Sequence, residues 1–291
     1  MYFTHFINAL LMVVLPVSLS FLVVSKYKIS WRLWWIGGTI FVLSQIGHIP
    51  FNNFIGQILN KTNMVYWTKT NQVIFNALFL GVSAGIWEEF ARYAMYRWWS
   101  REARNWRTGI LLGLGHGGFE SIIIGLIALY TFLQMMAIRN IDISSIVPPA
   151  QLSNATKSIS IYWAMPWYDS LIGSFERALT LPIQIALSLL ILQVFLRKKI
   201  KWLWAAIGYH AIVDTTAVLL ISFTNVYITE LLIILFSIFS IWIIFYLRSS
   251  EFNRGIVSIK PGPDEEKIMI EDVLETIENL DDTIYKQGVY P

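Results

Sequence analysis

Several ionisable side chains of this sequence lie inside segments that are apolar enough to cross a membrane. The stretch GIWEEFARY places Glu88, Glu89 and Arg92 near the middle of such a segment, residues 72–97. An ionisable group in the hydrocarbon of a bilayer costs about 2.5–3.5 kcal/mol even on a lenient scale, so it normally faces a protein interior and serves a function. These three residues are therefore candidates for chemistry.

Two further apolar segments carry polar pairs at helical spacing. His116 and Glu120 lie four residues apart in GHGGFE, and His210 and Asp214 lie four residues apart in YHAIVD. Side chains at i and i+4 share one face of a helix. At a rise of 1.5 Å per residue, Glu89, His116 and His210 are each expected about 12 Å from the cytoplasmic ends of their helices. We therefore expect three helices to present polar faces to one interior.

A carboxylate and two imidazoles at one depth are suited to activating a water molecule. A glutamate can act as general base, while histidines bind a metal or donate to a developing oxyanion. His116, His210 and Glu89 are the expected metal ligands. Asp214 or Glu120 is expected to orient an imidazole through its second ring nitrogen.

The two adjacent glutamates are expected to have different roles. Arg92 follows Glu88 by four residues and Glu89 by three, so one carboxylate can pair with the guanidinium while the other points elsewhere. Helix geometry favours Glu88 as the partner of Arg92 and Glu89 as the base, and both remain candidates for the base.

Other polar residues of the apolar segments are expected to support the structure. Glu176 and Arg177 lie nearer the outer end of their segment and are interpreted as a supporting ion pair. Gln184, two turns further on, is interpreted as a packing amide that could reach toward the site. His48 is interpreted as an interfacial residue.

Composition indicates an integral membrane protein. The chain has 291 residues, of which 56% are hydrophobic and 14% charged, well below the roughly 25% charged residues of soluble domains. The absence of cysteine excludes disulfides and thiolate chemistry. We expect an all-α, multi-pass protein of the cell membrane with seven transmembrane helices, at residues 4–25, 33–50, 72–97, 108–137, 171–196, 202–223 and 228–247.

Basic residues indicate the orientation of these helices. Lys and Arg concentrate after the first, third and fifth predicted spans, which predicts an outside N-terminus and a cytoplasmic C-terminus. The net charge of +3 is explained by this topology and implies no nucleic-acid partner. The sequence also has no phosphate-binding P-loop, so no nucleotide is expected.

Two parts of the chain are expected. Residues 1–248 form a seven-helix membrane domain that carries the site, and residues 249–291 form a cytoplasmic acidic tail in which a short amphipathic helix is plausible. The outer loop 138–170 has the Pro, Ser and Asn of an irregular or lid-like segment.

The ordered motifs EEFAR, GHGGFE, SFERAL and HAIVD resemble those of YhfC-type intramembrane metalloproteases. That family is related to type II CAAX prenyl endopeptidases and bacteriocin-processing (CPBP) membrane proteases. The superfamily pattern of Glu-Glu-x-x-x-Arg, a helix His and His-x-x-x-Asn/Asp is matched here by Glu88, Glu89, His116, His210 and Asp214.

The resemblance implies a membrane metalloendopeptidase that cleaves a membrane protein or peptide in the bilayer, using zinc or a similar divalent metal, or water activated without one. One departure concerns the base. Arg92 comes one residue earlier than the arginine of the superfamily pattern. The superfamily pattern would make Glu88 the base, whereas helix geometry in this chain favours Glu89.

A different class of function uses the same residue types. Intramembrane Glu, His and Asp also serve proton- or ion-coupled transporters. A carrier would spread its polar residues over several depths, whereas this sequence concentrates them at one level, so hydrolysis is the preferred interpretation.

Overall fold

The computed structural model describes residues 2–61 and 67–259, and it contains no strand within these ranges. The chain divides into two compact units, residues 1–245 and 246–291, and each is considered by itself. Most of the predicted acidic tail, including its amphipathic helix, lies outside the described residues. The prediction of an all-α fold is confirmed.

The described α-helices are α1 Tyr2–Tyr27, α2 Arg32–Asn60, α3 Lys69–Ala94, α4 Trp106–Ile138, α5 Pro149–Ala164, α6 Ile172–Leu196, α7 Lys201–Phe223 and α8 Val226–Ile259. A short π-helix, Met95–Trp99, follows α3, and two 3₁₀ turns, Ile143–Ser145 and Asp169–Leu171, flank α5 in the sequence.

Six of these helices are long and apolar enough to cross a membrane, namely α1, α3, α4, α6, α7 and the part of α8 up to Arg248. This agrees with a multi-pass membrane protein. α2 is not among the six, because polar residues and a proline interrupt its apolar run after Leu43. The seven-span count and the orientation therefore stay predictions.

The helices that carry the expected site residues begin at defined caps. The Thr68 side chain caps α3 by accepting from the Asn71 backbone N–H. At the start of α4, the Asn105 side chain accepts from Thr108 N at 3.1 Å and Thr108 Oγ1 accepts from Asn105 N at 3.3 Å. This reciprocal capping box satisfies donors that a helix start otherwise leaves unpaired.

The loop of residues 138–170, which the sequence predicts on the outer side, is more regular than its composition predicts. It contains the 16-residue helix α5, which begins with Pro149 at a position where the missing N–H of proline has no cost. None of its residues is buried, so polar side chains are tolerated along it. The ring of His5, near the start of α1, stacks on Tyr162 of α5 with 4.2 Å between centroids.

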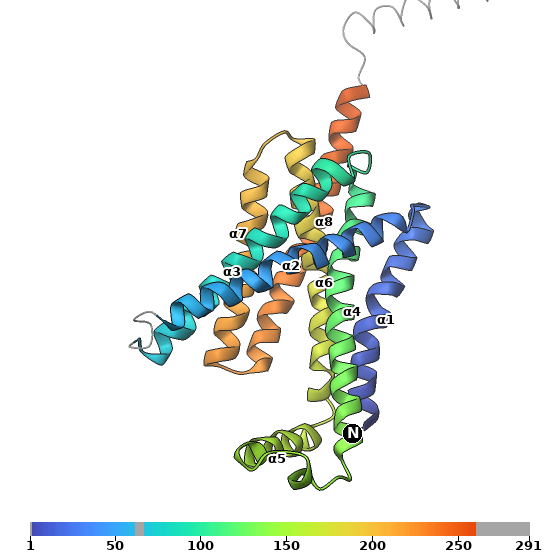
Figure 1. The fold of residues 1–291 in the computed structure, drawn as a ribbon. Helices are drawn as coiled ribbons and strands as arrows, with labels where there is room; N and C mark the ends of the chain where they lie inside the picture. The colour runs from blue at the N-terminus through green and yellow to red at the C-terminus, as the bar shows by residue number, and fades with distance from the viewer. Residues whose placement is uncertain (1, 62–66, 260–291) are drawn as a thin grey trace, which may run out of the picture. The chain divides into compact units, whose positions relative to one another are not determined.

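Close helix contacts hold the rest of the unit of residues 1–245 together. α1, α4 and α6 run side by side, α3 packs on α7, and α2 crosses α4 while touching α3 (Figure 1). Glycines make these contacts possible. A Cβ on Gly37 of α2 would lie 2.2 Å from Leu112 O of α4, and one on Gly115 of α4 would lie 2.2 Å from Trp34 O of α2. The two backbones thus meet directly beside His116.

Candidate active site

The two adjacent glutamates of α3 have different partners. Glu89 is fully buried, and its Oε1 accepts hydrogen bonds from Arg92 Nη1 and from His210 Nδ1, the latter at 2.8 Å. The guanidinium of Arg92 also donates to Gln184 Oε1 on α6. Glu89 is therefore held between a cation and an imidazole, away from solvent.

Glu88 faces three other helices. Its Oε1 accepts from Gln45 Nε2 of α2 at 2.9 Å, and its Oε2 lies 3.0 Å from His116 Nε2 of α4. The same Oε2 lies 4.0 Å from His210 Nε2 of α7 and 3.7 Å from Arg92 Nη2. Both histidines thus converge on this carboxylate.

The pairing of the glutamates is the reverse of the one that helix spacing favoured. Glu89, at i+3, hydrogen-bonds Arg92, whereas Glu88, at i+4, lies at the longer distance. Both spacings allow an ion pair with Arg92, so the partners on other helices decide which glutamate forms it. Gln184 binds the guanidinium, while Gln45 and His116 bind Glu88.

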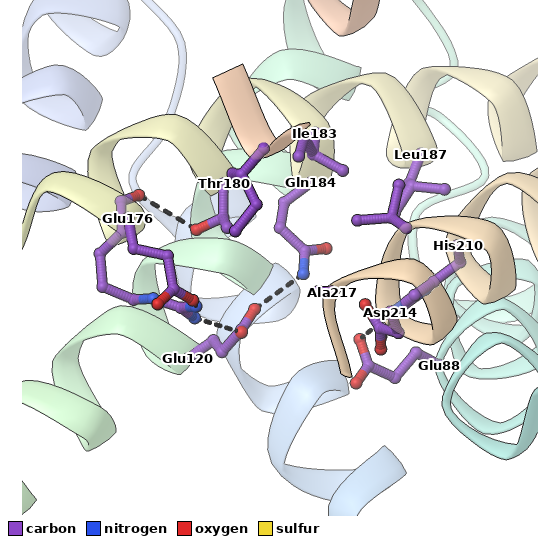
Figure 2. Close-up of a pocket in the computed structure, with 13 residues that line it drawn as sticks. Glu88, Glu120, Glu176, Thr180, Ile183, Gln184, Leu187, His210, Asp214 and Ala217 are labelled. Carbon is purple, nitrogen blue, oxygen red and sulfur yellow. Dashed lines mark hydrogen bonds and ion pairs between the residues drawn. The ribbon is translucent and has the colours of Figure 1, made fainter. Parts of the chain in front are cut away.

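A cavity of about 110 Å³ lies beside Glu88. Its ionisable lining residues are Glu88, Glu120, Glu176, Arg177, His210 and Asp214, and its apolar lining includes Ile183, Leu187, Val213, Ala217 and Ile233. In Figure 2 the carboxylates of Glu88 and Asp214 lie together next to His210, while Glu120 and Gln184 face each other. The volume is sufficient for several water molecules.

The contacts of His210 fix the proton on one ring nitrogen. Nδ1 must carry a proton to donate to Glu89, and Nε2 lies 4.0 Å from Glu88 Oε2 and 3.5 Å from Asp214 Oδ2. Two carboxylates around Nε2 call for a cation there, either a proton on the ring or a metal. A carboxylate that fixes Nδ1–H is also the usual support of a metal-binding histidine, and here Glu89 occupies that position.

The sequence left open whether Asp214 or Glu120 orients an imidazole, and in the structure only Asp214 lies next to one. Asp214 approaches His210, but Glu120 accepts from Arg177 Nη1 at 2.6 Å and from Gln184 Nε2 at 2.7 Å. Among the described residues no hydrogen-bond partner reaches the buried Nδ1 of His116. Orientation of His116 by Glu120 is therefore not seen, because Arg177 and Gln184 draw this carboxylate toward α6.

Gln184 connects two ionic clusters. Its Oε1 accepts from Arg92 and its Nε2 donates to Glu120, which in turn pairs with Arg177. Arg177 also contacts Glu176, as expected for an ion pair. The interpretation of Gln184 as a packing amide was wrong, since both ends of its amide bind charged groups.

Two polar residues with partly or fully buried side chains were missed by the sequence analysis. Gln45 contacts Glu88 directly, and polar residues at 45 and 48 of the predicted span 33–50, followed by residue 52, were the signal for it. Glu230 of α8 is buried at 6% exposure, and a complete count of the acids in the predicted spans would have found it.

The donor types of the site suit a zinc-type ion, because two imidazole nitrogens and a carboxylate are common zinc ligands. Within residues 2–61 and 67–259, however, no three His, Asp or Glu side chains are placed as a group that could hold a metal. The expected ligand Glu89 is turned toward Arg92 and His210 Nδ1, so Glu88 is the carboxylate that faces both histidines.

Comparison with known proteins gives two matches. Residues 11–235 match the family model described as YhfC intramembrane metalloprotease. The chain is also 29% identical over 208 residues to the "Uncharacterized membrane protein YhfC" of Bacillus subtilis (strain 168), covering 70% of this chain and 79% of that protein. No solved structure matches. The family match contains every candidate site residue.

Proposed function

This chain belongs to the YhfC intramembrane metalloprotease family, and from that membership and the site geometry we propose that it is a peptidase that hydrolyses a peptide bond within or beside the membrane. The observation that carries the proposal is the position of Glu88. Its carboxylate borders a cavity and faces the Nε2 atoms of two histidines from two other helices. Water activation requires a base and polar partners in this arrangement.

In the proposed reaction Glu88 takes a proton from a water molecule in the cavity. The water oxygen forms a bond to the carbonyl carbon of the scissile peptide, and the tetrahedral intermediate carries an oxyanion. Glu88 then returns the proton to the amide nitrogen as the carbon–nitrogen bond breaks. One group thus serves first as base and then as acid, which leaves its protonation state unchanged after each turnover.

The remaining residues orient this centre. Glu89 holds His210 through Nδ1, and Arg92 balances the charge of Glu89. His116 lies at hydrogen-bond distance from Glu88. The family's description implies a metal, which when bound would polarise the water or the carbonyl. His116 and His210 are the proposed ligands, with zinc or a similar divalent ion as the proposed metal, and Glu88 stays the base beside them.

The proposed substrate is a membrane protein or a peptide in the bilayer. A test incubates the purified protein with membrane-derived peptides in detergent and identifies new termini by mass spectrometry. Cleavages made by the wild type should be absent for Glu88→Gln, His116→Ala and His210→Ala. Equal cleavage by all three variants would contradict the proposal, as would proton-coupled flux in liposomes without any cleavage.

A further inference from the structure

A chain of hydrogen-bonded side chains runs along α2 to Glu88. Asn52 Nδ2 donates to His48 Nε2 at 2.8 Å, His48 Nδ1 lies 3.3 Å from Gln45 Oε1, and Gln45 Nε2 donates to Glu88 Oε1 at 2.9 Å. Gln45, His48 and Asn52 occupy one face of the helix, since their spacing is three and four residues. The chain therefore connects the middle of α2 with the carboxylate of the proposed base.

The direction of each bond is determined by its neighbour. An ionised Glu88 only accepts hydrogen bonds, so the NH₂ group of Gln45 must face it and the amide oxygen must face His48. His48 Nδ1 must then carry a proton, and its Nε2 is left as the acceptor for Asn52. A change at His48 would thus be transmitted to Glu88 through the orientation of one amide.

Close packing holds the two helices at this place. A Cβ on Gly47 of α2 would lie 2.2 Å from the ring of Trp87, the residue before Glu88 on α3. His48 Nε2 also lies 3.1 Å from Ser83 Oγ on α3. The separation of α2 and α3 is therefore fixed next to the Gln45–Glu88 bond.

Helix stability alone does not explain this polar face. The neighbouring residues Val42, Leu43, Ile46 and Ile49 are large, apolar and exposed, as expected for a surface in contact with lipid. In that setting apolar side chains at positions 45 and 48 would not need hydrogen-bond partners. The hydrogen bonds of Gln45 and His48 instead form a chain that ends at Glu88 Oε1.

We propose that Gln45 and His48 are positioning residues that fix the carboxylate of Glu88: Gln45 holds Oε1, His48 orients the amide of Gln45, and Oε2 is thereby left facing His116 and His210. This inference rests on the proposed function, because it concerns the base of that reaction. It gives His48, which the sequence analysis interpreted as interfacial, a role beyond that position, since His48 bonds Gln45 and Asn52 and lies within hydrogen-bond distance of Ser83.

The test compares Gln45→Met with Gln57→Met. Both changes replace an amide of α2 by a thioether of similar length, and Gln57 is exposed. The first readout is the rate at which dicyclohexylcarbodiimide modifies Glu88 in the purified protein, measured by mass spectrometry. A carboxyl group with fewer hydrogen-bond donors reacts faster, so Gln45→Met should raise the rate about tenfold, the expected effect of losing one bond to a charged group. Gln57→Met should leave it unchanged.

A second pair of variants tests the role of His48. Asn can place an N–H close to the position of His48 Nδ1, whereas Leu cannot. His48→Asn should therefore keep a labelling rate near that of the wild type, and His48→Leu should approach Gln45→Met. A purely structural role of His48 would give equal effects in both variants. If Gln45→Met does not fold, the labelling rates of the two His48 variants alone test the positioning role.

Peptide cleavage is the second readout. Gln45→Met should lower kcat about tenfold at unchanged KM, since it alters the base and not the binding of substrate. Faster labelling without any cleavage by the wild type would support the positioning role and contradict the proposed function. Labelling and kcat equal to the wild type in both Gln45→Met and His48→Leu would overturn the inference.

Discussion

Glu88 and Glu89 are adjacent in sequence but have different chemical surroundings. Glu89 is in contact with a guanidinium and an imidazole Nδ1 and has no access to the cavity, whereas Glu88 borders it. A base must reach water, and a group that holds a histidine must not move. The environments therefore support the proposed roles of Glu88 in proton transfer and of Glu89 in holding His210.

This assignment predicts different effects on activity and stability. Glu88→Gln should abolish cleavage with little change in thermal stability, because a glutamine can still bind Gln45 and His116. Glu89→Ala should destabilise the protein by about 3–5 kcal/mol, since it leaves the buried Arg92 without its main counter-charge. Thermal unfolding in detergent measures the difference. Equal loss of stability in the two variants would contradict the assignment.

Metal content gives a second test at the scale of residues. If His116 and His210 hold the metal, His116→Ala and His210→Ala should be purified without it. Glu89→Gln should bind it about 10–100-fold more weakly, as expected when the support of a ligand is lost. Metal analysis of the purified proteins after equilibration with zinc is the measurement. Glu120→Gln serves as the control, because Glu120 contacts Arg177 and Gln184 instead.

At the scale of elements, the crossing of α2 and α4 positions His116. Gly37 and Gly115 allow the two backbones to touch, whereas no described atom other than the local helix would contact a Cβ on Gly56 of α2. Any bulk at the crossing must separate the helices or strain them. The geometry of the site therefore depends on glycines that carry no chemistry.

The pair Gly37→Ala and Gly56→Ala should separate packing from helix propensity. Alanine in a helix normally stabilises by about 0.4–1 kcal/mol relative to glycine, which is the result expected for Gly56→Ala. Gly37→Ala should instead cost about 1–3 kcal/mol, the usual effect of overpacking, and should lower cleavage as His116 shifts. Unfolding and activity measurements on both variants would show this difference. A Gly37→Ala variant that is stabilised and fully active would contradict the role of the helix crossing.

Sequence alone predicted the long apolar helices well. The predicted spans 108–137, 171–196 and 202–223 agree closely with α4, α6 and α7, because membrane length fixes such segments. The end of α2 was placed at Pro50, yet the helix continues to Asn60. A proline inside a helix removes only one backbone bond when neighbours compensate, and sequence does not reveal those neighbours.

The side chains that meet around Glu88 were also recognisable, but their pairings were not. Ionisable residues in apolar segments pointed to Glu88, Glu89, His116 and His210, which the structure brings together. Which glutamate binds Arg92 depends on Gln184 and Gln45, which come from two other helices. Helix spacing describes neighbours within one helix, so it could not predict these contacts between helices.

At the scale of the unit of residues 1–245, residues of α3, α4, α6, α7 and α8 line the cavity beside Glu88. Its volume of about 110 Å³ is below the roughly 300–1,000 Å³ of sites that take drug-sized ligands. Water fits inside, whereas a peptide segment would have to reach Glu88 from the open side of the cavity, where 40% of the Asp214 side chain is exposed. In the proposed reaction the scissile bond is therefore expected to approach from that side.

Filling the cavity should then block the reaction without harming the fold. Ala217 of α7 lines the cavity, whereas Ala205 of the same helix is exposed. Ala217→Phe should displace the waters next to Glu88 and abolish cleavage, while the added apolar contacts keep thermal stability near that of the wild type. Ala205→Phe, at this exposed position, should leave both unchanged. Cleavage and unfolding assays on the two variants are the measurement.

An active, stable Ala217→Phe would place the hydrolytic water outside this cavity, because a phenyl ring and the attacking water cannot occupy the same space beside Glu88.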